Sequence, residues 1–200
     1  MEINRRFALA ATAAAVITLL CFTAGEAVPF QFIRSSCKVT QYPNLCEKSL
    51  CDFKPALQRR SPRQLAHAAL TVTSQRAVRV SNFVRRVSAD AGKSSPARGS
   101  HYGGGVRDCV ETLGESVDRL RLSVKEMERM GRYRSRSFRW HLSNVQTWVS
   151  AAITDQTTCI DSLAEDKSAA GPQIRSQIVY VNHLASNALA LINRLNPINN

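Results

Sequence analysis

The sequence predicts an all-α protein, namely an up-and-down antiparallel four-helix bundle preceded by an N-terminal helical hairpin and carrying two disulfides. Three observations predict this fold. Apolar residues recur in alternating steps of three and four over four long stretches, the pattern of a helix with one buried face. Glycine and proline interrupt the chain between these stretches. Five cysteines follow the N-terminal leader, enough for two disulfides and one further thiol.

The first 27 residues have the composition of a secretory signal peptide. Arg5 and Arg6 precede an uncharged run, rich in Ala and Leu, that continues to Thr23 and is followed by small residues. A membrane anchor is the alternative, because the uncharged run reaches the lower limit of a bilayer-spanning length. We expect cleavage after Ala27 or Gly25, and we take residues 28–200 as the secreted domain, without membrane association.

Residues 31–60 are expected to form the helical hairpin. Pro43 suits the first turn of its second helix, and Cys37 and Cys46 flank the intervening turn, where a disulfide between them would clamp the two helices. Cys51 is the cysteine left over. We interpret it either as a buried thiol in no disulfide or as the partner in a disulfide to a second molecule.

Residues 62–196 are expected to form the bundle. Its four apolar stripes run through residues 66–87, 106–127, 138–163 and 174–195. The segment 91–105, which ends in three consecutive glycines, is predicted to be a flexible connector. If the second and third helices turn near Arg134, then Cys109 and Cys159 lie equally far before and after the turn. Equal offsets put two residues at the same height in an antiparallel pair, so a Cys109–Cys159 disulfide is predicted.

The sequence offers no catalytic or metal-binding constellation, so we predict a protein that is not an enzyme and that needs no cofactor or metal. The four histidines fall on different predicted elements, without the i, i+4 pairing of a helical zinc site. Residues 114–116 (Gly-Glu-Ser) resemble a nucleophile elbow for three letters only, and they fall in the middle of a predicted helix, where that strained turn does not form.

The chain is strongly basic, with 27 Lys and Arg against 15 Asp and Glu and a formal net charge of +12, which indicates an anionic partner or surface. Residues 53–89 and 129–154 contain bases and no acid. Secretion argues against nucleic acid as the partner. Two interpretations are left open. The basic residues form a solvated face that keeps the protein soluble, or they adsorb the protein to an acidic extracellular polymer.

Several motifs together resemble the plant invertase and pectin methylesterase inhibitor family. They are FIRSSC at 32–37, TQYPNLC at 40–46, Asp108-Cys109, VQTWVSAAITDQTTC at 145–159 and SNALALI at 186–192. The resemblance covers roughly residues 31–196. It implies a helical hairpin packed on a four-helix bundle, with the same two disulfides.

For function, the resemblance implies non-covalent inhibition of a cell-wall carbohydrate enzyme, whose substrate cleft a helical face covers in a one-to-one complex. Thr158 matches a partner-facing threonine of pectin methylesterase inhibitors, and Thr157 and Gln156 are candidates beside it. Pectin methylesterase is the expected partner, since the Pro-Lys-Phe tripeptide that marks many invertase inhibitors is missing. The first alternative function is inhibition of acid invertase. The second alternative is that of a basic protein that binds anionic pectin. The expected location is the apoplast.

Overall fold

The computed structural model describes residues 27–51, 60–94, 104–164 and 170–196. These residues form helices and no strand, which confirms the predicted all-α class. The helices are α2 (Ala27–Cys37), α3 (Pro43–Leu50), α4 (Pro62–Ser94), α5 (Gly104–Arg129), α6 (Arg136–Ser162) and α7 (Gly171–Asn193). The predicted signal peptide lies, apart from Ala27, outside the described residues.

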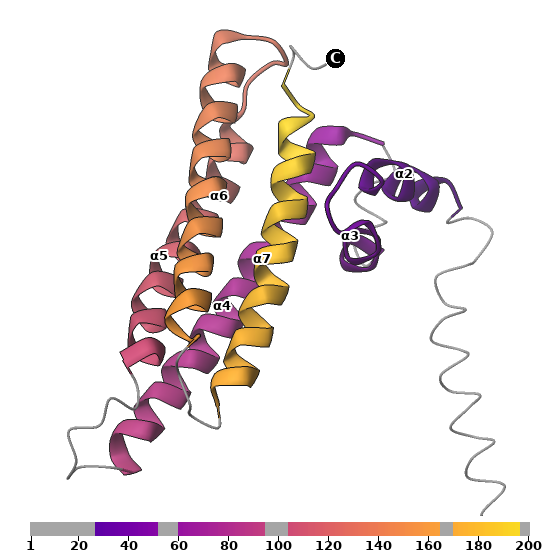
Figure 1. Cartoon of the computed structure of the whole chain (residues 1–200). Helices are drawn as coiled ribbons and strands as arrows, with labels where there is room; N and C mark the ends of the chain where they lie inside the picture. Colours follow the sequence, from indigo (N-terminus) through magenta and orange to yellow (C-terminus); the bar gives the residue numbers. More distant parts are fainter. Residues whose placement is uncertain (1–26, 52–59, 95–103, 165–169, 197–200) are drawn as a thin grey trace, which may run out of the picture.

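Helices α4 to α7 form the predicted antiparallel bundle (Figure 1). Each of them packs against its neighbour in the chain, and α4 also packs against α7, which closes the ring around one apolar core. The core contains the apolar stripes read from the sequence. Fully buried examples from the four helices are Leu70, Leu120, Val149 and Ile192.

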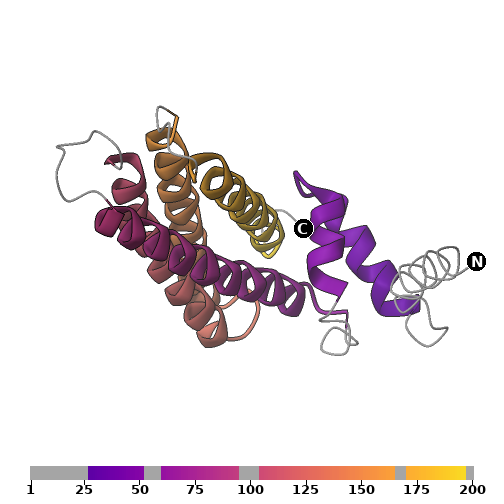
Figure 2. The same ribbon diagram turned by 90° about the horizontal axis from the view of Figure 1, so that it is seen from below.

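The hairpin of α2 and α3 lies to one side of the bundle, against α4 and α7 (Figure 2). A disulfide joins Cys37 to Cys46, with 5.7 Å between their Cα atoms, as the spacing predicts. Inside the turn, the Thr40 hydroxyl donates a hydrogen bond of 2.7 Å to the Cys37 carbonyl. Cys51 follows α3 directly, is half-buried rather than fully buried, and belongs to neither disulfide of the described chain.

The turn between α5 and α6 falls where the sequence places it, around Arg134, whose φ of 66° lies in the left-handed region. Ser135 caps α6, because its hydroxyl accepts a hydrogen bond of 3.0 Å from the Phe138 backbone N–H. The second predicted disulfide joins Cys109 to Cys159 across α5 and α6, and their Cα atoms are 4.5 Å apart.

Arg63, near the start of α4, binds the C-terminal end of α5 next to this turn. Its guanidinium donates to the carbonyls of Gly131 at 3.2 Å, Met127 at 3.0 Å and Met130 at 2.5 Å. The last carbonyls of an α-helix have no partner within the helix. One side chain therefore satisfies the C-terminal end of α5 and ties it to α4.

The prediction that residues 91–105 form a connector is wrong at both ends, because α4 continues to Ser94 and α5 begins at Gly104. The reason is clearest at Gly105, where a Cβ atom would lie 2.2 Å from the Ser162 carbonyl oxygen. Ser162 also donates a hydrogen bond of 3.2 Å from its hydroxyl to the Gly105 carbonyl. This glycine therefore serves the close approach of α5 to the end of α6 rather than the flexibility of a loop.

Candidate partner-binding face

The solvent-exposed side of α6 is a row of short hydroxyl side chains, which we call the hydroxyl row. Because residues three and four apart share one face of a helix, the row runs parallel to the helix axis from residue 143 to residue 158. Its members are exposed and uncharged, and they are Ser143, Thr147, Ser150, Thr154, Thr157 and Thr158. The opposite side of α6 is buried in the core through residues such as Leu142, Val145 and Val149.

Thr154 and Thr158 of the row are held by their own helix. Thr154 donates to the Ser150 carbonyl at 3.3 Å, and Thr158 donates to the Thr154 carbonyl at 3.1 Å. Each hydroxyl thereby uses its proton internally and keeps acceptor lone pairs for a partner. A β-branched side chain held in this way has little rotamer freedom to lose on binding.

Thr157 lies at the seam between α6 and α7. Its hydroxyl donates to the Ile153 carbonyl at 2.9 Å, and the Asn182 side-chain amide of α7 reaches its Oγ1 at 3.4 Å. Asn182 also donates to the Ile153 carbonyl at 3.3 Å. The structure thus brings Thr157 and Thr158 together on one exposed face, with α7 extending that face beyond α6.

The position of Gln156 differs from the one that the sequence predicts. Its side chain is fully buried, and its Nε2 donates a hydrogen bond of 2.9 Å to the Ser116 hydroxyl of α5. Ser116 in turn donates to the Ala152 carbonyl at 3.1 Å. The prediction that Gln156 contributes to a partner surface is therefore wrong. The signal was in the sequence, because position 156 falls on the apolar stripe of this helix, in step with Ala152 and Cys159.

Next to the hydroxyl row, an ionic cluster joins α6 to α5. Arg119 contacts Asp155, and it forms a 2.8 Å ion pair with Glu115 one turn away on α5. Burial raises the pKa of Asp155, and the opposing effects of the nearby Arg119 charge and hydrogen bond do not cancel that shift. The cluster fixes the side of α6 next to the row, so Asp155 has a structural role.

A buried carboxylate, Glu126, fixes the other half of the same seam. It accepts hydrogen bonds of 2.6 Å from Asn144 and lies 2.8 Å from His141 Nδ1, both on α6. The Asn144 hydrogen bond, aided by His141, holds the pKa of Glu126 below its ordinary value despite burial. Polar pairing therefore holds α5 and α6 in register along their length.

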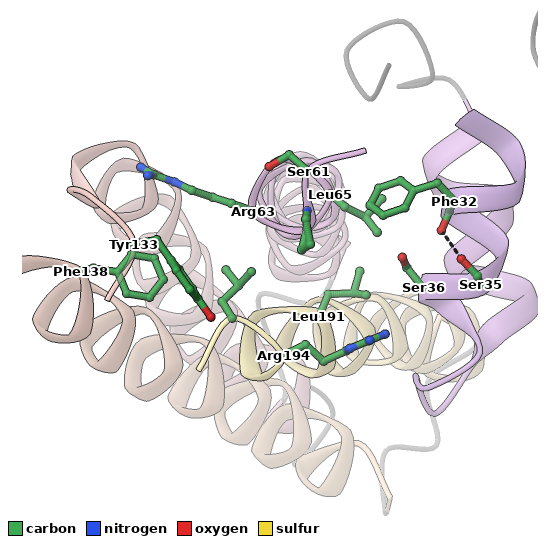
Figure 3. Close-up of a pocket in the computed structure, with 12 residues that line it drawn as sticks. Phe32, Ser35, Ser36, Ser61, Arg63, Leu65, Tyr133, Phe138, Leu191 and Arg194 are labelled. Carbon is green, nitrogen blue, oxygen red and sulfur yellow. Dashed lines mark hydrogen bonds between the residues drawn. The ribbon is translucent and has the colours of Figure 1, made fainter. Parts of the chain in front are cut away.

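A cavity of about 640 Å³ opens at the hairpin end of the bundle (Figure 3). It is lined by α2, the start of α4, the α5–α6 turn, the start of α6 and the end of α7, through Phe32, Ser35, Ser36, Ser61, Pro62, Arg63, Leu65, Tyr133, Phe138, Leu191, Arg194 and Leu195. None of these lining residues is an Asp, Glu, His or Cys.

The described parts of the chain contain no group of three or more His, Cys, Asp or Glu side chains placed to hold a metal ion. Among the same residues, no helix has the length and apolar character needed to cross a membrane. What the fold does present is a rigid, disulfide-braced bundle with an exposed row of ordered hydroxyls.

The chain belongs to the plant invertase/pectin methylesterase inhibitor family, because the sequence model of that family matches residues 31–191. It is 42% identical to "Pectinesterase inhibitor 9" of Arabidopsis thaliana, over 82% of this chain and 80% of that protein. It is 37% identical to the "21 kDa protein" of Daucus carota, over 88% of this chain and 89% of that protein.

The fold also resembles a solved structure of the same family. The crystal structure of a mutant form of a pectin methylesterase inhibitor from Arabidopsis matches with a TM-score of 0.59 at 19% identity, over 78% of this chain and 92% of that chain. At this identity the likeness concerns the fold alone. With its family established by sequence, the chain is a non-enzymatic member of an inhibitor family.

Proposed function

We propose that the protein inhibits pectin methylesterase by placing the hydroxyl row over the enzyme's substrate cleft in a non-covalent one-to-one complex. The observation that carries the proposal is the exposed, ordered Thr157–Thr158 pair in a chain that is 42% identical to a protein named as a pectinesterase inhibitor. Slower removal of methyl esters from wall pectin would follow from such a complex.

The geometry of the row supports this mode of binding. From Ser143 to Thr158 the row extends over about 22 Å at 1.5 Å per residue. A stable interface buries on the order of 1,600 Å² in total, so neighbouring α5 and α7 side chains such as Asn182 would share the contact. Short hydroxyls can accept hydrogen bonds from a cleft rim at a low desolvation cost, unlike buried charges.

Location is part of the proposal. Residues 1–27 direct secretion, and residues 28–200 act in the apoplast. The net charge of +12 favours a second candidate function, association with anionic pectin.

A paired inhibition assay tests the primary function. Oxidised protein of residues 28–200 is titrated against a plant pectin methylesterase and against an acid invertase at mildly acidic pH. Stoichiometric loss of methylesterase activity alone is the expected result. Loss of invertase activity alone would replace the proposal with the invertase alternative, and full activity of both enzymes would refute inhibition by this chain.

A further inference from the structure

The α5–α6 turn and the first residues of α6 carry a dense group of exposed arginine and aromatic side chains, which we call the arginine cap. Its members are Arg132, Tyr133, Arg134, Arg136, Arg139 and Trp140, all exposed. Trp140 is 67% exposed and Tyr133 is 48% exposed, and both are among the large hydrophobic side chains that the described surface leaves in solvent. Within the described chain, no acidic side chain forms an ion pair with any of the four arginines.

Stability of the fold does not account for this charge. Arg136 and Arg139 lie in the first turns of α6, where the helix dipole favours negative rather than positive charge. They are also spaced i, i+3, at which like charges repel. Arg134 adopts a left-handed conformation that glycine or asparagine accommodates more easily. Side chains placed against local preference in this way indicate a functional requirement.

The cap is ordered by its own contacts. The Arg134 guanidinium lies 5.5 Å from the centre of the Tyr133 ring, and Tyr133 packs edge-to-face on the buried Phe138 ring at 5.2 Å. Arg139 donates a hydrogen bond of 3.2 Å to the Arg134 carbonyl. A ligand would therefore meet Tyr133, Arg134 and Arg139 already positioned, which lowers the entropic cost of binding to these three side chains.

These groups match a particular ligand chemistry. Guanidinium groups bind carboxylates in a planar, bidentate manner, and exposed aromatic rings pack on the apolar faces of sugar rings. A polyuronate is a chain of sugar rings that each carry a carboxylate. We infer that the arginine cap is a binding site for anionic polyuronate, that is, for de-esterified pectin. The inference deepens the second candidate function and does not depend on enzyme inhibition.

The cap and the hydroxyl row are separate regions of one helix face. Arg136 and Trp140 are one turn apart and lead into Ser143, the first residue of the row. Trp140 and Thr158 are about 27 Å apart along α6 at 1.5 Å per residue. A polyuronate chain on the cap would therefore leave the far end of the row, where Thr157 and Thr158 lie, accessible to an enzyme.

A binding experiment with matched variants tests the inference. Oxidised native protein is titrated with polygalacturonate and with highly methyl-esterified pectin of similar length, by calorimetry and by tryptophan emission. The double variant R136A/R139A is compared with R79A/R86A, which removes two exposed arginines from α4 and changes the net charge equally. W140A removes a cap ring without changing charge. Because all these side chains are exposed, each variant is expected to fold, and far-UV circular dichroism checks this.

We expect the native protein to bind polygalacturonate and not the esterified polymer, with affinity that falls as salt rises. R136A/R139A is expected to weaken binding roughly tenfold, and R79A/R86A less than about twofold. W140A is expected to weaken it about threefold and to lose most of the change in emission. Absence of binding by the native protein would refute the association with pectin itself. Equal losses in the two double variants, or equal affinity for inorganic polyphosphate, would overturn the cap as a polyuronate site.

Discussion

Asn187 of α7 exchanges two hydrogen bonds with the backbone of Tyr42, in the turn of the hairpin. The Tyr42 N–H donates to Asn187 Oδ1 at 3.0 Å, and Asn187 Nδ2 donates to the Tyr42 carbonyl at 2.9 Å. The Tyr42 ring also stacks on His183, one turn earlier on α7, with ring centres 3.7 Å apart. These contacts fasten the small disulfide-clamped hairpin to the bundle.

We therefore expect Asn187→Ala to destabilise the protein by about 2 kcal/mol, because it removes two hydrogen bonds and leaves the Tyr42 N–H without an acceptor, while the Tyr42 carbonyl keeps the hydrogen bond from the Cys46 N–H. Asn187 is 2% exposed, so water reaches the site poorly. Urea unfolding of the oxidised protein measures the effect. Asn82→Ala on the exposed face of α4 is the control and should change stability by less than about 0.5 kcal/mol. Equal stability of the two variants would show that Asn187 does not hold the hairpin.

Gly105 allows a comparison with its neighbour. Gly105→Ala is expected to cost about 1–3 kcal/mol, because the new Cβ would lie 2.2 Å from the Ser162 carbonyl oxygen and would force α5 away from α6. At Gly104 the same atom would meet nothing within 4 Å, so Gly104→Ala should be neutral or stabilising by up to about 1 kcal/mol. Thermal unfolding of both variants measures the difference. If Gly105→Ala were as stable as Gly104→Ala, α5 and α6 would not approach as described.

Thr158 tests the proposed inhibitory face. Thr158→Lys is expected to weaken inhibition of pectin methylesterase at least about tenfold, because a long charged side chain would be desolvated in the proposed contact. Thr158→Ser keeps the hydroxyl and should change inhibition less than about threefold. Asn82→Lys on α4 adds the same charge away from the row and is the control. Equal potency of both lysine variants would remove Thr158 from the interface.

Glu126 should make stability depend on pH in the acidic range. Its pKa in the folded protein is lowered from 4.5, chiefly by the Asn144 hydrogen bond with help from His141. The carboxylate therefore stabilises the fold at pH values above about 4.5, and this contribution is lost as the pH falls through the lowered folded-state pKa. Glu126→Gln should be less stable than the native protein at pH 6, and the difference should shrink below pH 4.5.

Urea unfolding between pH 7 and pH 3 measures this difference. Glu128→Gln is the matched control, since the Glu128 side chain is 62% exposed, and this variant should differ little in stability from the native protein. A stability difference between native protein and Glu126→Gln that stays constant over this range would contradict the assigned role of the carboxylate.

Much of the architecture follows from local signals. The helix period is a property of neighbouring residues, so the four apolar stripes predict the four bundle helices without knowledge of their partners. Once two helices are known to run antiparallel around Arg134, chain geometry alone pairs Cys109 with Cys159. The boundaries are less predictable, because α4 and α5 extend into a segment whose glycines and proline indicate a loop.

The candidate site was predictable only in part. Thr157 and Thr158 are exposed on one face, which helical spacing indicates, whereas Gln156 is buried because it lies on the core stripe next to Ser116. The polar character of Gln156 indicated a solvent-exposed side chain. A buried partner on another helix satisfies its amide Nε2, and sequence cannot place that partner.

The sequence by itself therefore determined the helices, their antiparallel order and the cysteine pairs, since each depends on periodicity and spacing along one chain. Only the tertiary structure decided how the hairpin docks, which glycine allows close packing and which polar residues are buried. Tyr42 and Asn187 are 145 residues apart, and Gly105 meets Ser162 across two helices. Such contacts depend on which side chains of distant segments meet when the core closes, and no local pattern records that.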